Sequence, residues 1–356
     1  MSQNFARMAL TALASILSGL LSPAGMADEQ IGHEVLHSLP DADLIAEDVA
    51  FESRDGSYIV TSVRQRKVLR IAADGTVTDL LTASQVPMWG AFAVALDPSR
   101  NTLWVTTSAV PHIKQYSASD DGRSAVLRID RRTGTLRHRY ELSDGRPHAF
   151  GDMTVARNGT AYIADGLGGG VYRIRPGRPN TLEPVVKPGT LRSPQTPAIS
   201  PDGSILLVPD YSQGIARVSL AGGQLTWLKH PPELELRGID GFYWRGRTLI
   251  AIQNGTSPER LLEMSLDDSG TRISRWQPLL AGAPGLGDAT HGVLHGDCFD
   301  FIANSGWDRF GDDGKALPDS VATPAQIWRV AVAADKAAGR PPHGASEGCA
   351  GTGARH

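Results

Sequence analysis

The stretch VLRI at residues 68–71 is followed by five similar stretches along the chain: VLRI (126–129), VYRI (171–174), IARV (215–218), LLEM (261–264) and IWRV (327–330). Successive copies start 58, 45, 44, 46 and 66 residues apart. A second apolar stretch precedes each copy, as YIV (58–60), LWV (103–105), YIA (162–164), LLV (206–208), LIA (249–251) and FIA (301–303). Six units of this length, each with several short strands, are typical of propeller blades, with insertions in the second and sixth units.

Tight turns separate the strands within the units. Asp55-Gly56, Asn158-Gly159 and Asp202-Gly203 tolerate the positive φ that short hairpins require. A sandwich would not repeat one signature in this way, and a solenoid would need capping repeats. The sequence therefore predicts an all-β, six-bladed β-propeller of four-stranded antiparallel blades. Residues 33–44 are expected to supply the strand that closes the ring onto the last blade.

Composition limits the partners and the compartment. The chain has 356 residues and a formal net charge of −3, with Lys and Arg scattered along it. No basic face is expected, which argues against a nucleic-acid partner. The only cysteines are Cys298 and Cys349. We expect Cys298 to be a small buried apolar residue, and a bridge to Cys349, although an oxidising compartment permits it, is the less favoured alternative.

The N-terminus resembles a secretory signal peptide. Arg7 supplies a positive charge, residues 9–21 form an apolar run, and Ala27 stands at a small-residue cleavage position. The prediction is a signal peptide at 1–27, a single propeller domain at 28–334 and a flexible tail at 335–356, with an uncleaved anchor as the alternative. The mature protein is then expected to be a periplasmic or secreted monomer, without a membrane span.

In a propeller, the starts of the innermost strands meet at one end of the central channel. Aligning the six units places the following residues there: Glu47, Phe92, Gly151-Asp152, Gln195, Asp240 and Thr290-His291. Carboxylates that converge on one axis repel each other unless a cation lies among them. The oxygen ligands favour Ca²⁺, ahead of Mg²⁺ or Mn²⁺.

Several blades resemble a known superfamily. The stretches are AEDVAFESRDGSYIVTSV (46–63), GDMTVARNGTAYIADG (151–166), SPQTPAISPDGSILLVPDYSQGIARV (193–218), RGIDGFYWRGRTLIAIQNG (237–255) and HGVLHGDCFDFIANSGWD (291–308). They are similar to blades of the senescence-marker-protein, gluconolactonase and luciferin-regenerating-enzyme superfamily, over roughly residues 40–332. The resemblance implies a six-bladed propeller, and many members are lactonases or other esterases with one divalent cation, often Ca²⁺.

The resemblance also implies a ligand set. Glu47 matches the glutamate of the first blade and Asp240 matches the aspartate of the fifth. Gly151 replaces the asparagine of the third blade, although Asp152 follows it, and Gln195 replaces that of the fourth. The predicted metal ligands are therefore Glu47, Asp152, Gln195 and Asp240.

Two functions stay open at this point. The first is a hydrolase of a lactone or ester, with Asp240 and His291 as catalytic residues and the cation polarising the carbonyl. The second is a non-catalytic propeller that binds a small molecule or a protein. Each residue also has a structural alternative, since Asp240 could accept backbone N–H groups and a single histidine is more often structural. Two insertions, at 111–123 and 307–325, would shape access through His112, Tyr116, Trp307 and Asp308 if both lie at the channel mouth.

Overall fold

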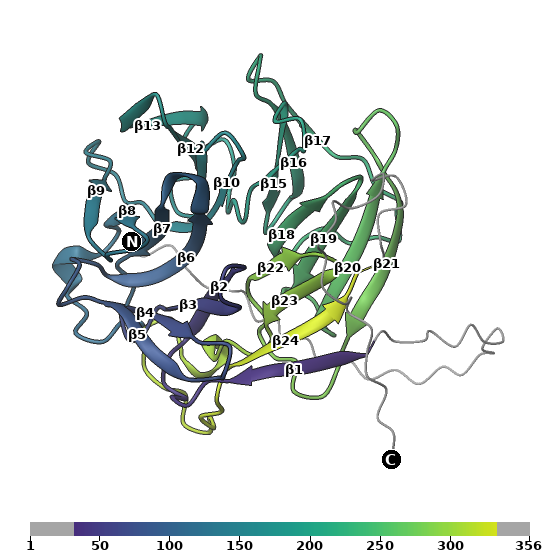
Figure 1. Ribbon diagram of the computed structural model, residues 1–356. Helices are drawn as coiled ribbons and strands as arrows, with labels where there is room; N and C mark the ends of the chain where they lie inside the picture. The colour runs from purple at the N-terminus through teal and green to yellow at the C-terminus, as the bar shows by residue number, and fades with distance from the viewer. Residues whose placement is uncertain (1–31, 333–356) are drawn as a thin grey trace.

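The computed structural model describes residues 32–332, apart from the side chains of residues 179 and 180. It contains six four-stranded sheets arranged in a ring, which confirms the predicted six-bladed propeller (Figure 1). The predicted signal peptide at 1–27 and tail at 335–356 lie outside the described residues. Within those residues, the structure contains no helix long and apolar enough to cross a membrane.

The first three blades follow one another along the chain. The first comprises β2 (Ala46–Glu52), β3 (Ser57–Ser62), β4 (Lys67–Ile71) and β5 (Val77–Thr82). The second comprises β6 (Gly90–Asp97), β7 (Thr102–Ser108), β8 (Ser124–Asp130) and β9 (Leu136–Tyr140). The third comprises β10 (Phe150–Val155), β11 (Ala161–Asp165), β12 (Gly170–Arg175) and β13 (Arg178–Val186).

The remaining blades complete the ring. The fourth comprises β14 (Ala198–Ile199), β15 (Ile205–Asp210), β16 (Gly214–Ser219) and β17 (Leu225–Trp227). The fifth comprises β18 (Ile239–Arg245), β19 (Thr248–Gln253), β20 (Arg260–Leu266) and β21 (Ile273–Ala281). The sixth comprises β22 (Gly292–His295), β23 (Cys298–Ile302), β24 (Gln326–Ala331) and β1 (His33–Ser38), so strands from both ends of the described chain share one sheet. Since β1 pairs antiparallel with β24, the predicted closure of the ring is confirmed.

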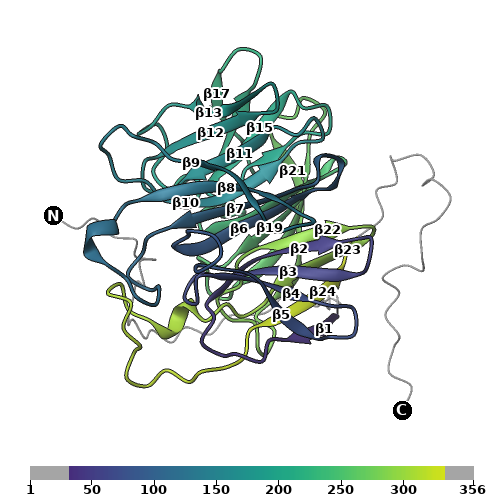
Figure 2. The same cartoon turned by 60° about the vertical axis from the view of Figure 1, so that its left-hand side comes forward.

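Position within a blade explains the sequence pattern. The second strands β3, β7, β11 and β23 are buried along their whole length, because other blades cover both of their faces. Five of the repeated four-residue stretches have arginine at their third position, and we call these the signature arginines. They lie on the third strands, at half-buried positions between buried apolar residues. Gly56, Gly159 and Gly203 have positive φ, as their turns predicted. The blades pack side by side around the ring, which Figure 2 shows turned by 60° from Figure 1.

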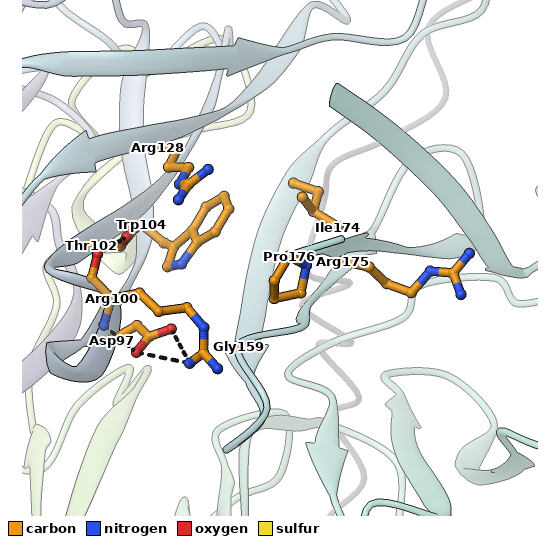
Figure 3. A pocket seen from close by; sticks show the side chains of 9 residues that line it. All are labelled: Asp97, Arg100, Thr102, Trp104, Arg128, Gly159, Ile174, Arg175 and Pro176. Carbon is orange, nitrogen blue, oxygen red and sulfur yellow. Dashed lines mark hydrogen bonds and ion pairs between the residues drawn. The ribbon is translucent and has the colours of Figure 1, made fainter. Parts of the chain in front are cut away.

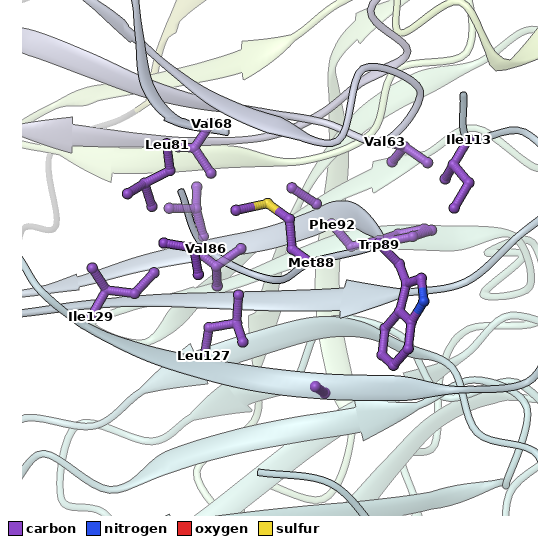
Figure 4. Packing of buried hydrophobic residues seen from close by; sticks show 14 of the residues in the cluster. Val63, Val68, Leu81, Val86, Met88, Trp89, Phe92, Ile113, Leu127 and Ile129 are labelled. Carbon is purple, nitrogen blue, oxygen red and sulfur yellow. The ribbon is translucent and has the colours of Figure 1, made fainter. Parts of the chain in front are cut away.

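Apolar side chains fill the space between neighbouring blades. Between the first and second blades, the cluster includes Val68, Leu81, Met88 and Leu127 (Figure 4). Ile113, from the insertion between β7 and β8, packs in the same cluster. This insertion is therefore anchored in the core.

Cys298 differs from its prediction in one respect. It is buried in β23 as expected, but it is disulfide-bonded. The expectation of an unbridged apolar residue is therefore wrong, since an oxidised pair is compatible with burial at this position. Cys349, the other cysteine of the sequence, lies outside the described residues.

Candidate metal site at the channel mouth

Irregularities in the innermost strands turn side chains toward the mouth of the central channel. The register shifts between Ala46 and Val49 in β2, between Phe150 and Asp152 in β10, and between Ile239 and Phe242 in β18. Such β-bulges add residues to one strand and turn their side chains away from the regular alternation. Glu47 and Asp240 lie within these shifts and Asp152 lies at the edge of one.

Asp152, Asp240 and His291 form a compact buried group. Their ligand-type atoms all lie within 4.8 Å of one another. His291 Nε2 lies 2.6 Å from Asp152 Oδ1 and 3.9 Å from Asp240 Oδ1. Only 2% of His291 is exposed to solvent, against 5% of each aspartate. The prediction that these three side chains converge from the third, fifth and sixth blades therefore agrees with the geometry.

Glu47 lies beside this group and is held from two sides. Its backbone carbonyl accepts hydrogen bonds from Thr290 Oγ1 at 2.7 Å and His291 Nδ1 at 3.0 Å. Its carboxylate Oε2 accepts from Trp307 Nε1 at 2.5 Å, and Oε1 lies 3.9 Å from His291 Nδ1. The first and sixth blades therefore meet at the site itself.

Neighbouring side chains orient the two aspartates. Thr196 Oγ1 donates to Asp152 Oδ1 at 2.8 Å, and Asn254 Nδ2 donates to Asp240 Oδ2 at 2.6 Å. Tyr211 in turn donates to Asn254 Oδ1 at 3.0 Å. These contacts fix the carboxylates without neutralising them, as the outer partners of metal ligands do.

Gln195 is placed differently from the other predicted ligands. Its side-chain Nε2 donates to the carbonyl of Ser193 at 3.2 Å and to Ser193 Oγ at 3.0 Å. In residues 32–332, no hydrogen bond joins Gln195 to the two aspartates or to His291. The neighbouring Thr196, rather than Gln195, contacts Asp152.

Comparison of the sequence with protein families and with curated proteins gives no match. Solved structures are similar in fold. A gluconolactonase from Xanthomonas campestris aligns over 85% of this chain and 89% of its own, with 18% identity and a TM-score of 0.56. The PQQ-bound aldose sugar dehydrogenase from Streptomyces coelicolor aligns over 84% and 98%, with 18% identity and a TM-score of 0.57. A catalytically inactive virginiamycin B lyase from Staphylococcus aureus, solved with quinupristin, aligns over 83% of both chains, with 15% identity and a TM-score of 0.56.

The chain shares the fold of these three proteins. Identities this low show the fold alone, and the three similar proteins are named for three different activities. The chemistry of this propeller therefore has to follow from its own site.

The hydrogen bonds of His291 constrain what lies at its Nε2. Because the Glu47 carbonyl can only accept, His291 Nδ1 carries a proton and donates it. In a neutral ring, Nε2 then presents a lone pair to the carboxylate of Asp152, and two acceptors at 2.6 Å repel each other. Either a proton or a metal cation relieves this repulsion.

Electrostatics favours positive charge at this position. Burial alone would lower the pKa of His291, but the carboxylates of Asp152, Asp240 and Asp48 raise it well above the ordinary imidazole value. A single imidazolium would offset only part of this acidic group. The donor set fits a divalent cation: carboxylates suit Ca²⁺, Mg²⁺ or Mn²⁺, whereas an imidazole nitrogen among the ligands favours Zn²⁺ or Fe²⁺.

The two insertions lie at the same end of the channel as the acidic group. The first insertion follows β7 and the second follows β23. These strands pair antiparallel with the innermost strands β6 and β22, which begin at the mouth, so β7 and β23 end there. The first contains the short 3-10 helix η2 (Ala118–Asp120) and the second contains η3 (Trp307–Arg309). His112 of the first insertion packs edge-on against Trp307 of the second, with 4.8 Å between ring centroids. The two insertions therefore contact each other beside Glu47, which accepts a hydrogen bond from Trp307.

Sequence reasoning missed some residues at the site. Asp48 is buried next to Glu47 and accepts from the backbone N–H groups of Val49 and Val94, both at 2.7 Å. Burial, the largest influence, raises the pKa of Asp48 to about 6. Thr196 and Asn254 were also missed. The adjacent acids Glu47-Asp48 were a visible signal, whereas nothing in the sequence distinguished Thr196 or Asn254 from other polar residues.

Proposed function

We propose that this protein is a metal-dependent hydrolase that opens a lactone or a related ester at the mouth of its channel. The observation that carries the proposal is the orientation of His291, whose Nε2 faces two carboxylates while its Nδ1 donates to a carbonyl. Metal-binding histidines commonly donate their second N–H in this way. A bound divalent cation would supply Lewis-acid polarisation of the substrate carbonyl.

Each residue of the site has its own role in the proposed reaction. Asp152, Asp240 and His291 are the proposed ligands, and Thr196 and Asn254 keep the aspartates in place. Glu47 lies beside this group, and its carboxylate is the proposed acceptor of a proton from an attacking water. Trp307 orients Glu47 through its indole N–H. The predicted signal peptide supports an activity outside the cytoplasm as part of the same proposal.

A second candidate is a cation with a structural role in a propeller that binds without catalysis. The burial of the three proposed ligands favours it, since substrate must reach a site that is 5% exposed or less at each residue. In that case the cation would stabilise the fold, and no ester would be turned over.

A substrate panel with matched variants separates the two candidates. The purified protein is first assayed for metal content, and then against a set of lactones and aryl esters with and without chelator. The hydrolase proposal expects turnover that chelator abolishes, that one divalent ion restores, and that Asp240→Asn lowers about 100-fold or more. Asp202→Asn, which removes the same charge from an exposed turn, is the control and should leave turnover unchanged. Bound metal without turnover of any substrate would support the structural role, and absence of both would overturn both candidates.

A further inference from the structure

Charged side chains join the second and third blades at both ends of their junction. At the end away from the mouth, Arg100 pairs with Asp97 at 3.0 Å. Arg100 also packs against Gly159 of the third blade, where a Cβ would lie 2.4 Å from its Cζ atom. Figure 3 shows this ion pair beside Trp104. Because an arginine stays charged at every physiological pH, this contact does not respond to pH. At the mouth end, the cation is a histidine.

His148 lies in the loop of residues 141–149 that leads from β9 to β10, which we call the β9–β10 loop. It is buried, with Nδ1 2.6 Å from Asp165 Oδ2 and Nε2 2.9 Å from Asp144 Oδ1. Ionised carboxylates only accept hydrogen bonds, so both ring nitrogens donate and the ring is an imidazolium. Burial alone would lower the pKa of His148, but its hydrogen bonds to Asp165 and Asp144 raise it above the ordinary imidazole value.

The groups around the ring come from several elements. Asp165 belongs to β11, and Asp144 belongs to the β9–β10 loop itself, with Arg146 Nε 3.9 Å from Asp144 Oδ2. Tyr172 of β12 stays neutral, because burial, followed by the charges of Asp165 and Asp144, raises its pKa to about 12. The β10 side contributes the ring of Phe150, 6.0 Å from that of His148. The imidazolium therefore has a carboxylate at each of its two nitrogens.

The β9–β10 loop also supports the first insertion. The backbone N–H of His148 donates to the Gly122 carbonyl at 2.8 Å, and Arg123 pairs with Glu141 at 3.5 Å. Gly122 has a φ of +71°, and a Cβ there would collide with Pro147. The first insertion therefore rests on the β9–β10 loop, and displacement of this loop would loosen the rim of the mouth.

Loss of the proton from His148 would release Asp144 rather than Asp165. Asp165 is fully buried and also accepts the backbone N–H groups of Ala149 and Gly168, at 2.9 and 2.8 Å, so it keeps the Nδ1 proton. Nε2 then presents a lone pair to Asp144 Oδ1, and two acceptors 2.9 Å apart repel each other. Because the Asp144 side chain is 37% exposed, it can turn into solvent.

We propose that His148 is a pH-sensitive switch at the channel mouth: its imidazolium holds the β9–β10 loop against the third blade, and the neutral ring releases this loop together with the first insertion. The folded pKa is raised above the ordinary value of 6.5. The stabilisation is therefore complete below pH 6.5 and is lost as the pH rises through the folded value. The inference is independent of the proposed hydrolase, because the switch shares no residue with the proposed metal site.

Histidine titration measures the charge of the ring. Ring resonances of the full chain, labelled with ¹³C-histidine, are followed from pH 5 to pH 10 in chelator, so that no cation binds at the mouth. The His148 resonance is assigned by through-bond NMR experiments. We expect its titration midpoint to lie above pH 6.5, and to be about one pH unit lower in Asp144→Asn, which removes one of the two carboxylates.

Hydrogen exchange measures the release of the loop. Amide exchange over residues 141–149 is compared about one pH unit below and above the measured midpoint, after correction for the intrinsic effect of pH on exchange. Wild type should exchange about tenfold faster above the midpoint. Asp144→Asn should change less than about twofold, because an amide can turn its oxygen toward a charged ring or its NH₂ toward a neutral one. Asp120→Asn is the control: it removes a charge that pairs with Arg123 in the first insertion, and it should open as wild type does.

His148→Gln removes the imidazolium and should exchange fast at both pH values. If this variant does not fold, Asp144→Asn alone decides, since its substitution is at a partly exposed position. The inference is overturned if wild-type His148 titrates at or below pH 6.5, if exchange in the loop does not rise above the midpoint, or if Asp144→Asn opens as wild type does.

Discussion

At the scale of single residues, position in the blade decides what an aspartate does. Asp210, at the end of β15, accepts the backbone N–H groups of Arg192 and Ser212 at 2.6 and 3.0 Å, so it fixes loops. Asp240, at the start of an innermost strand, instead accepts from the Asn254 side chain and faces His291. An acid held by backbone N–H groups is a structural element, whereas an acid turned toward a histidine and another acid is suited to holding a cation.

Asp240→Asn therefore has a distinctive expected effect on stability. In chelator, the melting temperature should barely fall, and it can rise, because one of several mutually repelling carboxylates is removed. With a binding divalent ion, wild type should melt higher than in chelator, and the variant should lose most of that increase. Thermal melts of both proteins with Ca²⁺, Mn²⁺, Zn²⁺ or chelator measure this. A variant destabilised by the same roughly 1–3 kcal/mol in every condition would make Asp240 a structural acceptor.

The substitution Trp307→Phe tests whether the indole N–H of Trp307 positions Glu47. Phenylalanine retains an aromatic ring beside His112 and Phe92 but removes the N–H that Glu47 accepts. If Glu47 accepts a proton during hydrolysis, kcat should fall about tenfold and its pH profile should shift, with KM little changed. Trp244→Phe, which removes an indole N–H donated to a loop carbonyl far from the mouth, is the control. Equal effects of the two substitutions on kcat would argue against a positioning role for Trp307.

At the scale of strands and loops, the repeat made most of the site predictable. Since each blade presents the start of its innermost strand at one end of the channel, alignment of the units placed Glu47, Asp152, Asp240 and His291 together, as the structure does. The same alignment also placed Gln195 at the mouth, but in the structure its side chain bonds to Ser193.

Prolines shorten the innermost strand of the fourth blade. Pro194, Pro197 and Pro201 lack the N–H that a strand ladder needs, and β14 has only two residues. The backbone N–H of Gln195 donates to the Pro209 carbonyl at 2.8 Å, and its side chain bonds to its own loop. Alignment predicts which blade contributes to the mouth, but local backbone restrictions decide which side chain arrives.

The two insertions contact each other, and a glycine permits the contact. Gly314, in the second insertion, has a φ of +72°, and a Cβ there would collide with the carbonyl of Pro111 in the first. Gly314→Ala should therefore loosen both loops, and limited proteolysis should cut between residues 303 and 325 faster than in wild type. Gly270→Ala is the matched control, because Gly270 also has positive φ, at +63°, but faces open space. Cleavage of this loop that is no faster in Gly314→Ala than in Gly270→Ala would show that the close approach of Gly314 to Pro111 does not hold the loops together.

At the scale of the whole molecule, the ring is closed by buried charge as well as by strand pairing. Asp300 of the sixth blade is fully buried and accepts from Tyr58 of the first blade at 2.5 Å and from Arg329 Nε at 2.7 Å. His295 Nε2 lies 2.5 Å from the same carboxylate. Strand β1 and this network thus join the first and last blades. The repeat predicted the closing strand, but not this network, since the contact joins residues 242 positions apart.

Asp300 should make the stability of the closed ring depend on acid. Burial would raise the pKa of Asp300, but hydrogen bonds from Arg329, His295 and Tyr58 lower it below the ordinary value of 3.8. The unfolded chain therefore binds this proton more readily than the folded protein. The stabilisation is complete above the ordinary carboxyl pKa and is lost as the pH falls through the lower folded value. Asp300→Asn breaks a buried ion pair and should cost about 3 kcal/mol at pH 7.

The difference in unfolding free energy between wild type and Asp300→Asn should shrink as the pH falls below about 4, because protonation then removes the same charge from wild type. Urea denaturation of both proteins between pH 7 and pH 3 measures this difference directly. Asp55→Asn is the matched control: Asp55 also pairs with a signature arginine, Arg70, but its side chain is 46% exposed. Its substitution should change stability far less, since solvent screens an exposed pair. A cost for Asp300→Asn that is constant from pH 7 to pH 3 would show that packing and neutral hydrogen bonds, rather than the carboxylate charge, join the first blade to the last.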